Sequence, residues 1–253
     1  MRSNGKVAAI IQARMGSSRL PGKMLKPIMG RPVLGYMVER VRRSRLLDDV
    51  VVATSTNPQD DQIEAFCAAN GVSVFRGSED DVLSRIVGAI KAYDIEVQVE
   101  LYGDCPLMDP EVIDRLIEVF LQGDYDCVFN ALKATYPSGL QAKVLRAAIY
   151  VDQERVLTEW KYRESPALCI RDFLDKFRVT NVQAPPEVAQ PDVYIELDTE
   201  EDFVVIRSIL EALYPKKPDF STVDVLRFLA KNPDLRRLNQ GVVRQWKAVI
   251  KDV

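Results

Sequence analysis

Short apolar runs alternate with longer amphipathic stretches along most of this chain, and this alternation limits the folds that it can adopt. Buried strands are predicted by the apolar runs at residues 7–11, 50–54, 72–75, 97–101 and 126–129. Between them, helical patterns cover residues 32–47, 59–70, 80–93 and 110–122. Because parallel neighbours need a crossover helix, the order predicts an α/β fold with a mostly parallel, mixed sheet and helices on both faces.

The second half of the chain departs from this pattern. Residues 134–190 are interrupted by prolines and carry one helical pattern near 145–159, so we expect an inserted lid or dimerisation segment. A strand at 193–197 and a helix at 199–213, capped by Asp198 or Thr199, then resume the core. We therefore expect one main α/β domain over residues 1–215 and a C-terminal helical extension over 216–253, with two amphipathic helices between 221 and 251.

Composition excludes several kinds of chemistry and of partner. The chain has no histidine, which removes Ser-His-Asp hydrolysis, Cys-His proteolysis and zinc sites built from histidine. Its 34 Lys and Arg against 37 Asp and Glu give a net charge of −3, so no general positive field attracts nucleic acid or an anionic membrane. Its four cysteines are widely spaced, as expected for reduced thiols.

The first residues predict neither a signal peptide nor a membrane anchor. Residues 1–6 are polar, and the apolar run at 7–11 is far shorter than a membrane span. We therefore expect a cytoplasmic protein without a membrane partner. Trp160 and Trp246 lie in amphipathic stretches, where a core or interface position is expected.

A loop rich in glycine and serine follows the first predicted strand. Gly16, Ser17, Ser18 and Gly22 can present backbone N–H groups to an anion without crowding Cβ atoms. Arg14, Arg19 and Lys23 add positive charge, as exposed loop cations. The spacing matches neither the GxGxxG pattern of Rossmann dinucleotide sites nor the GxxxxGK[ST] pattern of P-loop ATPases. Two interpretations remain: a phosphate-binding loop of another type, or a basic surface turn without a ligand.

Two carboxylates lie at the ends of predicted strands. Asp104 follows the strand at 97–101, and Asp198 follows the strand at 193–197. Because the chain lacks imidazole, the pair suits a hard cation such as Mg²⁺ bridging phosphate oxygens. The alternatives are an ordinary loop carboxylate for Asp104 and a helix N-cap for Asp198.

Several longer strings carry a family resemblance. They are residues 11–25 (IQARMGSSRLPGKML), 30–34 (GRPVL), 53–55 (ATS), 75–83 (FRGSEDDVL), 103–110 (GDCPLMDP) and 197–203 (LDTEEDF). The chain resembles cytidylyltransferases of the spore-coat-polysaccharide-biosynthesis type, which are related to the CMP-sialic acid and CMP-Kdo synthetases. The resemblance implies a nucleotide-diphospho-sugar transferase-like (GT-A-like) fold.

The resemblance also implies roles for individual residues. The triphosphate of CTP would be held by Arg14, Ser17, Ser18, Arg19 and Lys23. The nucleoside would lie near Ala53, Thr54, Arg76 and Gly77, and Gln12, Ala13 and Gly16 would complete the nucleotide-binding set. Lys23, Arg19 and Asp104 would be the catalytic residues, and Asp104 and Asp198 would hold the cofactor Mg²⁺.

The implied reaction transfers CMP from CTP to an acidic sugar or related small acid and releases pyrophosphate. The resemblance places this reaction in surface-polysaccharide or glycoconjugate biosynthesis, and we expect a homodimer.

On the acceptor side the sequence departs from the family pattern at three places. Residues 99–102 (VELY) lack an Arg, residues 138–145 (SGLQAKVL) replace a DGxDxEVF-like stretch, and residues 162–166 (YRESP) stand where relatives have Arg-Glu-His-Val-Thr. The alternatives are a GT-A-type glycosyltransferase, although Asp104-Cys105-Pro106 is not a DxD pair, and a catalytically silent nucleotide-binding paralogue.

Overall fold

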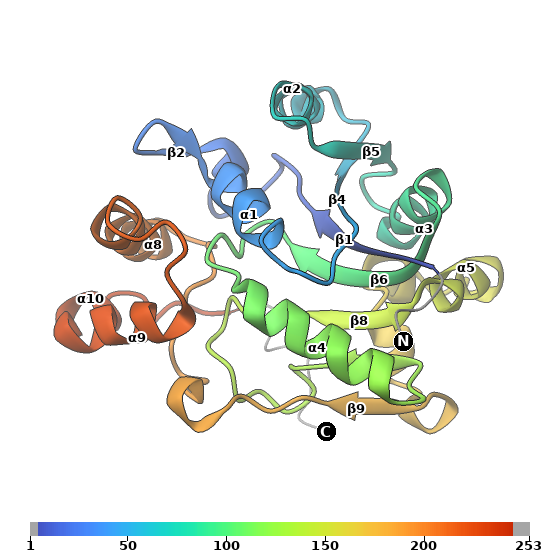
Figure 1. Cartoon of the computed structure of the whole chain (residues 1–253). Helices are drawn as coiled ribbons and strands as arrows, with labels where there is room; N and C mark the ends of the chain where they lie inside the picture. Colours follow the sequence, from blue (N-terminus) through green and yellow to red (C-terminus); the bar gives the residue numbers. More distant parts are fainter. Residues whose placement is uncertain (1–4, 245–253) are drawn as a thin grey trace.

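A seven-stranded sheet forms the centre of the molecule in the computed structural model, which describes residues 5–244 (Figure 1). Its strands are β1 (Lys6–Gln12), β4 (Asp49–Ser55), β5 (Ser73–Gly77), β6 (Ile95–Tyr102), β7 (Cys127–Phe129), β8 (Lys143–Arg146) and β9 (Val179–Asn181). In space their order is β5-β4-β1-β6-β8-β7-β9. A separate hairpin pairs β2 (Pro27–Ile28) with β3 (Arg31–Pro32).

The sheet is mixed, as predicted. β1 pairs in parallel with β4 and β6, β4 with β5, and β7 with β9, whereas β8 runs antiparallel to both β6 and β7. The register places Gln12 beside Ala53 on one side and Tyr102 on the other. The carboxyl ends of these three strands therefore share one edge of the sheet, where open α/β sheets bind their ligands.

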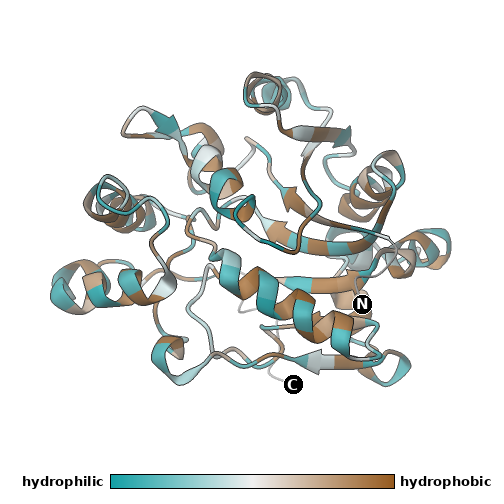
Figure 2. Ribbon diagram, in the orientation of Figure 1, coloured by the Kyte–Doolittle hydropathy of each residue, from teal (hydrophilic) through white to brown (hydrophobic). Residues whose placement is uncertain are grey.

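Helices cover both faces of this sheet (Figures 1 and 2). On one face, apolar side chains such as Ala9 and Ile11 pack with α1 (Val33–Val41), α2 (Asp61–Ala69), α4 (Pro110–Gln122), α8 (Glu200–Leu213) and α9 (Thr222–Lys231). On the other, Ala8 and Ile10 pack with α3 (Val82–Ala92), α5 (Ala147–Val156), α6 (Trp160–Glu164) and α7 (Leu168–Arg171). Alternate residues of β1 thus enter two separate cores, which explains its uninterrupted apolar run.

The helix predicted over residues 32–47 ends earlier, at Val41. The carboxylate of Asp114 on α4 accepts hydrogen bonds from Ser44 Oγ and from the backbone N–H groups of Arg45 and Leu46. A buried carboxylate far along the chain satisfies these N–H groups, so the chain turns away from the helix here.

Residues 134–190 contribute more than the expected lid, because they supply β8 and β9 to the central sheet. β8 lies between β6 and β7, and the helix predicted near 145–159 is α5. The short 3₁₀ turn Leu174–Lys176 precedes β9.

The strand predicted at 193–197 is not formed. The segment makes only one isolated bridge, between Tyr194 and Ser138. Ser138 N–H donates to Val193 O, and Ile195 N–H donates to Ser138 O, each at 2.8 Å. Gly139, with φ of 106°, allows this contact, since a Cβ there would lie 2.7 Å from the Ile195 carbonyl. α8 then begins after Thr199, which with Asp202 forms a capping box.

In the part of the chain that the structure describes, two helices follow α8, and the second of them is short. α9 is joined to the start of α4, because Asp109 Oδ2 accepts from both N–H and Oγ of Thr222 at 2.7 Å. α10 (Pro233–Arg237) is followed by residues 239–244, which lie outside helices; Trp246 and the rest of the predicted helix lie outside the described residues. Within residues 5–244, no helix combines the length and apolar character needed to cross a bilayer.

Candidate active site

The loop after β1 folds back on itself at the carboxyl edge of the sheet. Met15 O accepts from Ser17 N–H at 2.9 Å and from Gly22 N–H at 3.2 Å, and Asp60 Oδ1 holds Met15 N–H at 2.7 Å. Gly22 adopts a φ of 72°, which favours glycine. A 3₁₀ turn, η1 (Lys23–Leu25), follows directly and aims Lys23 back into the molecule.

Lys23 joins the two carboxylates singled out in the sequence. Its Nζ lies 2.8 Å from Asp104 Oδ2 and 3.0 Å from Asp198 Oδ1, and it also donates to Leu197 O at 2.7 Å. Arg19 adds a second cation, with Nη2 2.9 Å from Asp198 Oδ2. Asp104 and Asp198 therefore meet at Lys23, as expected, but of the two only Asp104 lines the cleft described below.

Backbone contacts bring Asp198 to this position. Leu197 N–H donates to Asp104 O at 2.8 Å, which attaches this segment to the chain just beyond the end of β6. The capping carboxylate of Asp202 then holds Asp198 N–H at 3.0 Å. Asp198 thus faces the loop without being part of a strand, and Thr199 is the helix cap.

The burial of Lys23 differs from the expected exposed loop cation. Only 6% of the residue is exposed. Burial lowers the pKa of the Lys23 ammonium, but the adjacent carboxylates of Asp104 and Asp198 outweigh it, so the pKa is raised above its ordinary value. Lys23 therefore stays charged at neutral pH.

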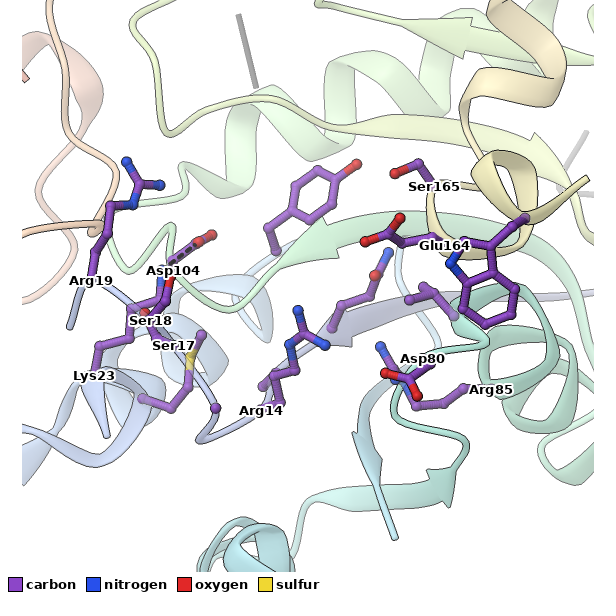
Figure 3. Close-up of a pocket in the computed structure, with 17 residues that line it drawn as sticks. Arg14, Ser17, Ser18, Arg19, Lys23, Asp80, Arg85, Asp104, Glu164 and Ser165 are labelled. Atoms are coloured by element: carbon purple, nitrogen blue, oxygen red, sulfur yellow. Dashed lines mark hydrogen bonds and ion pairs between the residues drawn. The ribbon is translucent and has the colours of Figure 1, made fainter. Parts of the chain in front are cut away.

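A cleft of about 420 Å³ opens beside this cluster (Figure 3). In the view of Figure 3, Arg19, Lys23 and Asp104 lie at one end, Asp80, Arg85, Glu164 and Ser165 at the other, and Arg14 between them. The predicted residues that line the cleft are Gln12, Ala13, Arg14, Gly16, Ser17, Ser18, Arg19, Lys23 and Asp104. The loop therefore forms a wall of a real cavity.

Four residues expected near the nucleoside do not line this cleft. Ala53 and Thr54 are fully buried in β4. Arg76 lies on β5 and is paired with Asp61 and Glu64, and Gly77 packs against the backbone of Arg85. All four residues lie on β4 and β5, outside the lining of the cleft.

Other cleft residues were missed in the sequence. They are Met24, Asp80, Val82, Arg85, Tyr102, Trp160, Glu164 and Ser165. Trp160, expected in a core or interface, is 54% exposed and lies on the cleft wall. Tyr102, Glu164 and Ser165 fall within the stretches that depart from the family pattern, and this departure was the available signal.

The wall formed by α6 is held against α3. Arg163 donates to Asp81 Oδ2 through Nε at 2.7 Å and Nη2 at 2.5 Å, and Asp81 caps the N-terminus of α3. On the same side, Arg85 Nη1 donates to Ser78 O at 2.6 Å and Glu79 O at 3.0 Å, which holds the loop before α3. Glu164 and Ser165 thus line the same end of the cleft as Asp80, which lies in the loop that Arg85 holds in place before α3.

A buried polar network lies under the cleft floor. Glu100 on β6 receives Lys143 Nζ of β8 at 2.6 Å, Tyr150 OH of α5 at 2.8 Å and Gln12 Nε2 at 2.9 Å. Lys143 also donates to the hydroxyl of Tyr102 at 2.8 Å. Burial raises the pKa of Tyr102 to about 12, so this phenol stays protonated and keeps its place in the network.

The thiols take no part in this chemistry. All four cysteines are free and buried, as expected, and burial raises the pKa of Cys105, next to Asp104, well above its ordinary value. Among residues 5–244, no group of three or more Cys, Asp or Glu side chains is arranged to hold a metal ion, so a cation here would rely on Asp104, Asp198 and oxygens of its substrate.

The mixed sheet, the loop after β1 and the cleft at the carboxyl edge define a nucleotide-binding transferase of the nucleotide-diphospho-sugar transferase fold. A family model described as cytidylyltransferase matches residues 8–215. The chain therefore belongs to the cytidylyltransferase family, as its resemblance predicted, and the glycosyltransferase alternative is set aside.

Individual relatives agree with this assignment. The chain is 40% identical over 235 residues to the spore coat polysaccharide biosynthesis protein SpsF of Bacillus subtilis (strain 168), covering 89% of this chain and 94% of that protein. A cytidylyltransferase structure from Leptospira borgpetersenii superposes with a TM-score of 0.88 at 31% identity, covering 95% of this chain and all of that one. The fold is also that of CMP:2-keto-3-deoxy-manno-octonic acid synthetase complexed with CTP (TM-score 0.59, 17% identity, 81% of this chain and 98% of that one covered).

Proposed function

We propose that this chain transfers CMP from CTP to a small acidic acceptor, an acidic sugar or related acid, and releases pyrophosphate. The observation that carries the proposal is the Lys23 ammonium joining Asp104 and Asp198 beside the loop that lines the cleft. Cations and carboxylates so close together suit the binding of a metal-complexed triphosphate. Family membership supports CTP as the nucleotide.

In this proposal the loop holds the triphosphate. Arg14, Arg19 and Lys23 supply positive charge, and on the cleft wall Ser17 supplies a hydroxyl and Ser18 a hydroxyl and a backbone N–H. Charge-assisted hydrogen bonds of this kind are among the stronger polar contacts in proteins. They also position the α-phosphoryl group, which is the main protein contribution to phosphoryl transfer.

Asp104 and Asp198 are proposed to hold Mg²⁺. The donor set fits, because Mg²⁺ takes one or two carboxylates together with phosphate oxygens and water. Both side chains are partly accessible, with 30% of Asp104 and 12% of Asp198 exposed. When bound, the ion would neutralise charge on the transferring phosphoryl group.

The proposed reaction needs no histidine. An acceptor oxygen attacks the α-phosphorus of CTP in line, a new P–O bond forms, and the bond from this phosphorus to the oxygen bridging to the β-phosphorus breaks. Pyrophosphate leaves with the bonding electron pair, and Lys23 and Arg19 stabilise the charge that develops. A carboxylate acceptor is already an oxyanion, and a hydroxyl acceptor could give its proton to Asp104.

We place the cytosine base and the acceptor at different parts of the cleft end that lies away from Lys23. The cytosine base would lie against Asp80, Val82 and Arg85, next to the end of β5. The acceptor would lie against α6 and Tyr102, where Trp160 can cover an apolar face and Glu164 can accept hydroxyl donors. The departures from the family pattern near this wall favour an acceptor that differs from those of most relatives.

The biological setting is also a proposal. The name of the Bacillus relative supports a role in surface-polysaccharide or glycoconjugate biosynthesis. We propose a cytoplasmic homodimer, with residues 1–215 as the nucleotidyltransferase domain and 216–253 as a helical extension.

Thermal unfolding with each nucleotide tests the proposal directly. A ligand that binds only the folded chain raises its melting temperature by mass action, so CTP with Mg²⁺ should raise it more than ATP, GTP or UTP. Equal shifts with all four nucleotides would remove the assignment to cytidine. Pyrophosphate release measured over a panel of acidic sugars and phosphonates would then identify the acceptor, and CTP binding without release from any acceptor would favour the silent paralogue.

A further inference from the structure

The segment after α10 returns to the catalytic edge of the sheet. This segment, residues 239–244, is called the C-terminal arm below, and it places two buried side chains against the start of α8. Asn239 is 2% exposed and Arg244 is 4% exposed. Neither residue lines the cleft, so their burial is not explained by direct contact with a substrate there.

Arg244 and Asn239 both bind the capping carboxylate Asp202. Arg244 donates to Asp202 through Nη1 at 2.9 Å and Nη2 at 2.7 Å, a two-pronged contact with both carboxylate oxygens. Asn239 Nδ2 adds a bond to Oδ1 at 2.8 Å. Burial raises the pKa of Asp202, but the hydrogen bonds from Arg244 and Asn239 outweigh it and leave the pKa lowered, in keeping with a charged group.

Asp202, held in this way, in turn holds the backbone at Asp198. Its Oδ2 accepts from the backbone N–H groups of Asp198 and Thr199, each at 3.0 Å. A second link runs through Arg19, whose Nη1 donates to Val243 O of the arm at 3.0 Å while its Nη2 contacts Asp198. The arm is therefore linked to Asp198 in two ways. One route runs through Asp202 to the backbone N–H of Asp198, and the other runs through Arg19 to the Asp198 carboxylate.

A second capping box in the same chain shows that helix capping alone does not require a buried arginine. Ser221 and Asp224 form the same motif at the start of α9. There the carboxylate is 19% exposed, and its cations, Lys217 and Arg227, are largely exposed surface side chains. Asp202 is fully buried, with a buried guanidinium on both of its oxygens. The difference points to a role beyond starting the helix.

We propose that Arg244 is a positioning residue for Asp198, acting through Asp202, so that the C-terminal arm completes the cation-binding half of the active site. The proposal rests on the proposed function, in which Asp198 is a ligand of the divalent cation. A guanidinium group that binds both carboxylate oxygens limits how far the Asp202 side chain can move. It therefore also limits the movement of the backbone N–H groups of Asp198 and Thr199, which donate to that carboxylate. Partners one step behind a metal ligand commonly change metal affinity by about 10- to 100-fold when removed.

The test separates cation binding from nucleotide binding in the full chain. Mn²⁺ is titrated into the protein with CTP present, and unbound Mn²⁺ is followed by electron paramagnetic resonance; CTP binding is measured separately by calorimetry in EDTA. Arg244→Gln should weaken Mn²⁺ binding by about tenfold and change CTP binding in EDTA by less than about twofold. Arg244→Lys should recover part of the loss, because it restores the charge without the fork.

Further variants distinguish a positioning role of Arg244 from a general loss of fold and from failure of the metal assignment. Arg236→Gln, which removes a surface pair with Asp192, should leave both affinities unchanged. If Arg244→Gln does not fold, Asn239→Ala removes one bond to Asp202 and should weaken Mn²⁺ binding by about threefold in the same titration. Parental Mn²⁺ affinity in folded Arg244→Gln, or in Asn239→Ala where that variant is needed, would overturn the proposal. If the parent chain with CTP binds no Mn²⁺, or Asp198→Asn binds it normally, the metal assignment itself fails.

Discussion

The ammonium nitrogen of Lys23 lies 3.0 Å from Oδ1 of Asp198, although the two residues are 175 positions apart in the chain. One residue comes from the loop after the first strand and the other from the segment before α8. Both lie at the carboxyl edge of the sheet. Their contact means that the proposed phosphate loop and the proposed metal ligand form one electrostatic unit.

Lys23→Ala is expected to impair both stability and binding. It would leave the carboxylates of Asp104 and Asp198 close together without their shared cation, at a cost of about 1 to 3 kcal/mol in the free energy of unfolding. CTP binding, measured by calorimetry, should also weaken. Wild-type CTP affinity in a folded Lys23→Ala chain would show that the loop is not the phosphate site.

Arg19→Ala is the matched variant, because 26% of the Arg19 side chain is exposed. Its loss should change the free energy of unfolding by less than about 1 kcal/mol. CTP binding should still weaken, since a charge-assisted phosphate contact is removed. Chemical denaturation and calorimetry on the two variants would show whether burial of the cation, rather than its charge, sets the stability cost.

Asp104→Asn and Asp198→Asn should each largely abolish pyrophosphate release. Each change removes a charged oxygen ligand from the proposed cation site, while the cations that face the triphosphate remain. CTP binding measured in EDTA should stay nearly unchanged. Asp234→Asn, on the exposed start of α10, is the control and should retain full activity. Full activity in Asp104→Asn would end the metal assignment for this residue.

Lys143→Met should destabilise the fold strongly. The Lys143 side chain is 5% exposed and that of Glu100 is 1% exposed, so removing the cation leaves a buried carboxylate without its partner, at a cost of about 3 to 5 kcal/mol. The double variant Glu100→Gln with Lys143→Met should recover part of this loss, because no uncompensated charge remains. Denaturant unfolding of the three proteins measures the difference, and a double variant less stable than Lys143→Met would contradict the explanation.

Acid should weaken the capping box of α9. Hydrogen bonds from Lys217 and from the backbone N–H of Ser221 lower the pKa of Asp224 from 3.8 to about 2. Because the folded-state pKa is lowered, the stabilisation is present above pH 3.8 and is lost as the pH falls through about 2. The stability advantage over Asp224→Asn should therefore shrink between these values in denaturant titrations. An advantage that stays constant down to pH 2 would argue against a titrating cap.

Local sequence was enough to predict most of the fold and the elements that bear the site. Period-two and period-3.6 patterns depend on which neighbours a residue has in the chain, and they gave the central strands and the α/β class. The loop at 11–25 and Asp104 could be found for the same reason, since glycine spacing and a carboxylate at a strand end are local features. Thr199 as the cap of α8 belongs here too.

Long-range contacts decided what the local pattern could not. The run at 193–197 reads as a strand, yet it meets Ser138 and Asp104 rather than a sheet neighbour. Lys23 reads as an exposed cation, yet two carboxylates from distant segments bury it. Trp160 reads as a core or interface residue, yet at the start of α6 it lies on the wall of the cleft. Burial, charge pairing and cleft lining depend on which distant residues the folded sheet brings together, and this information lies in the packing rather than in any one stretch of sequence.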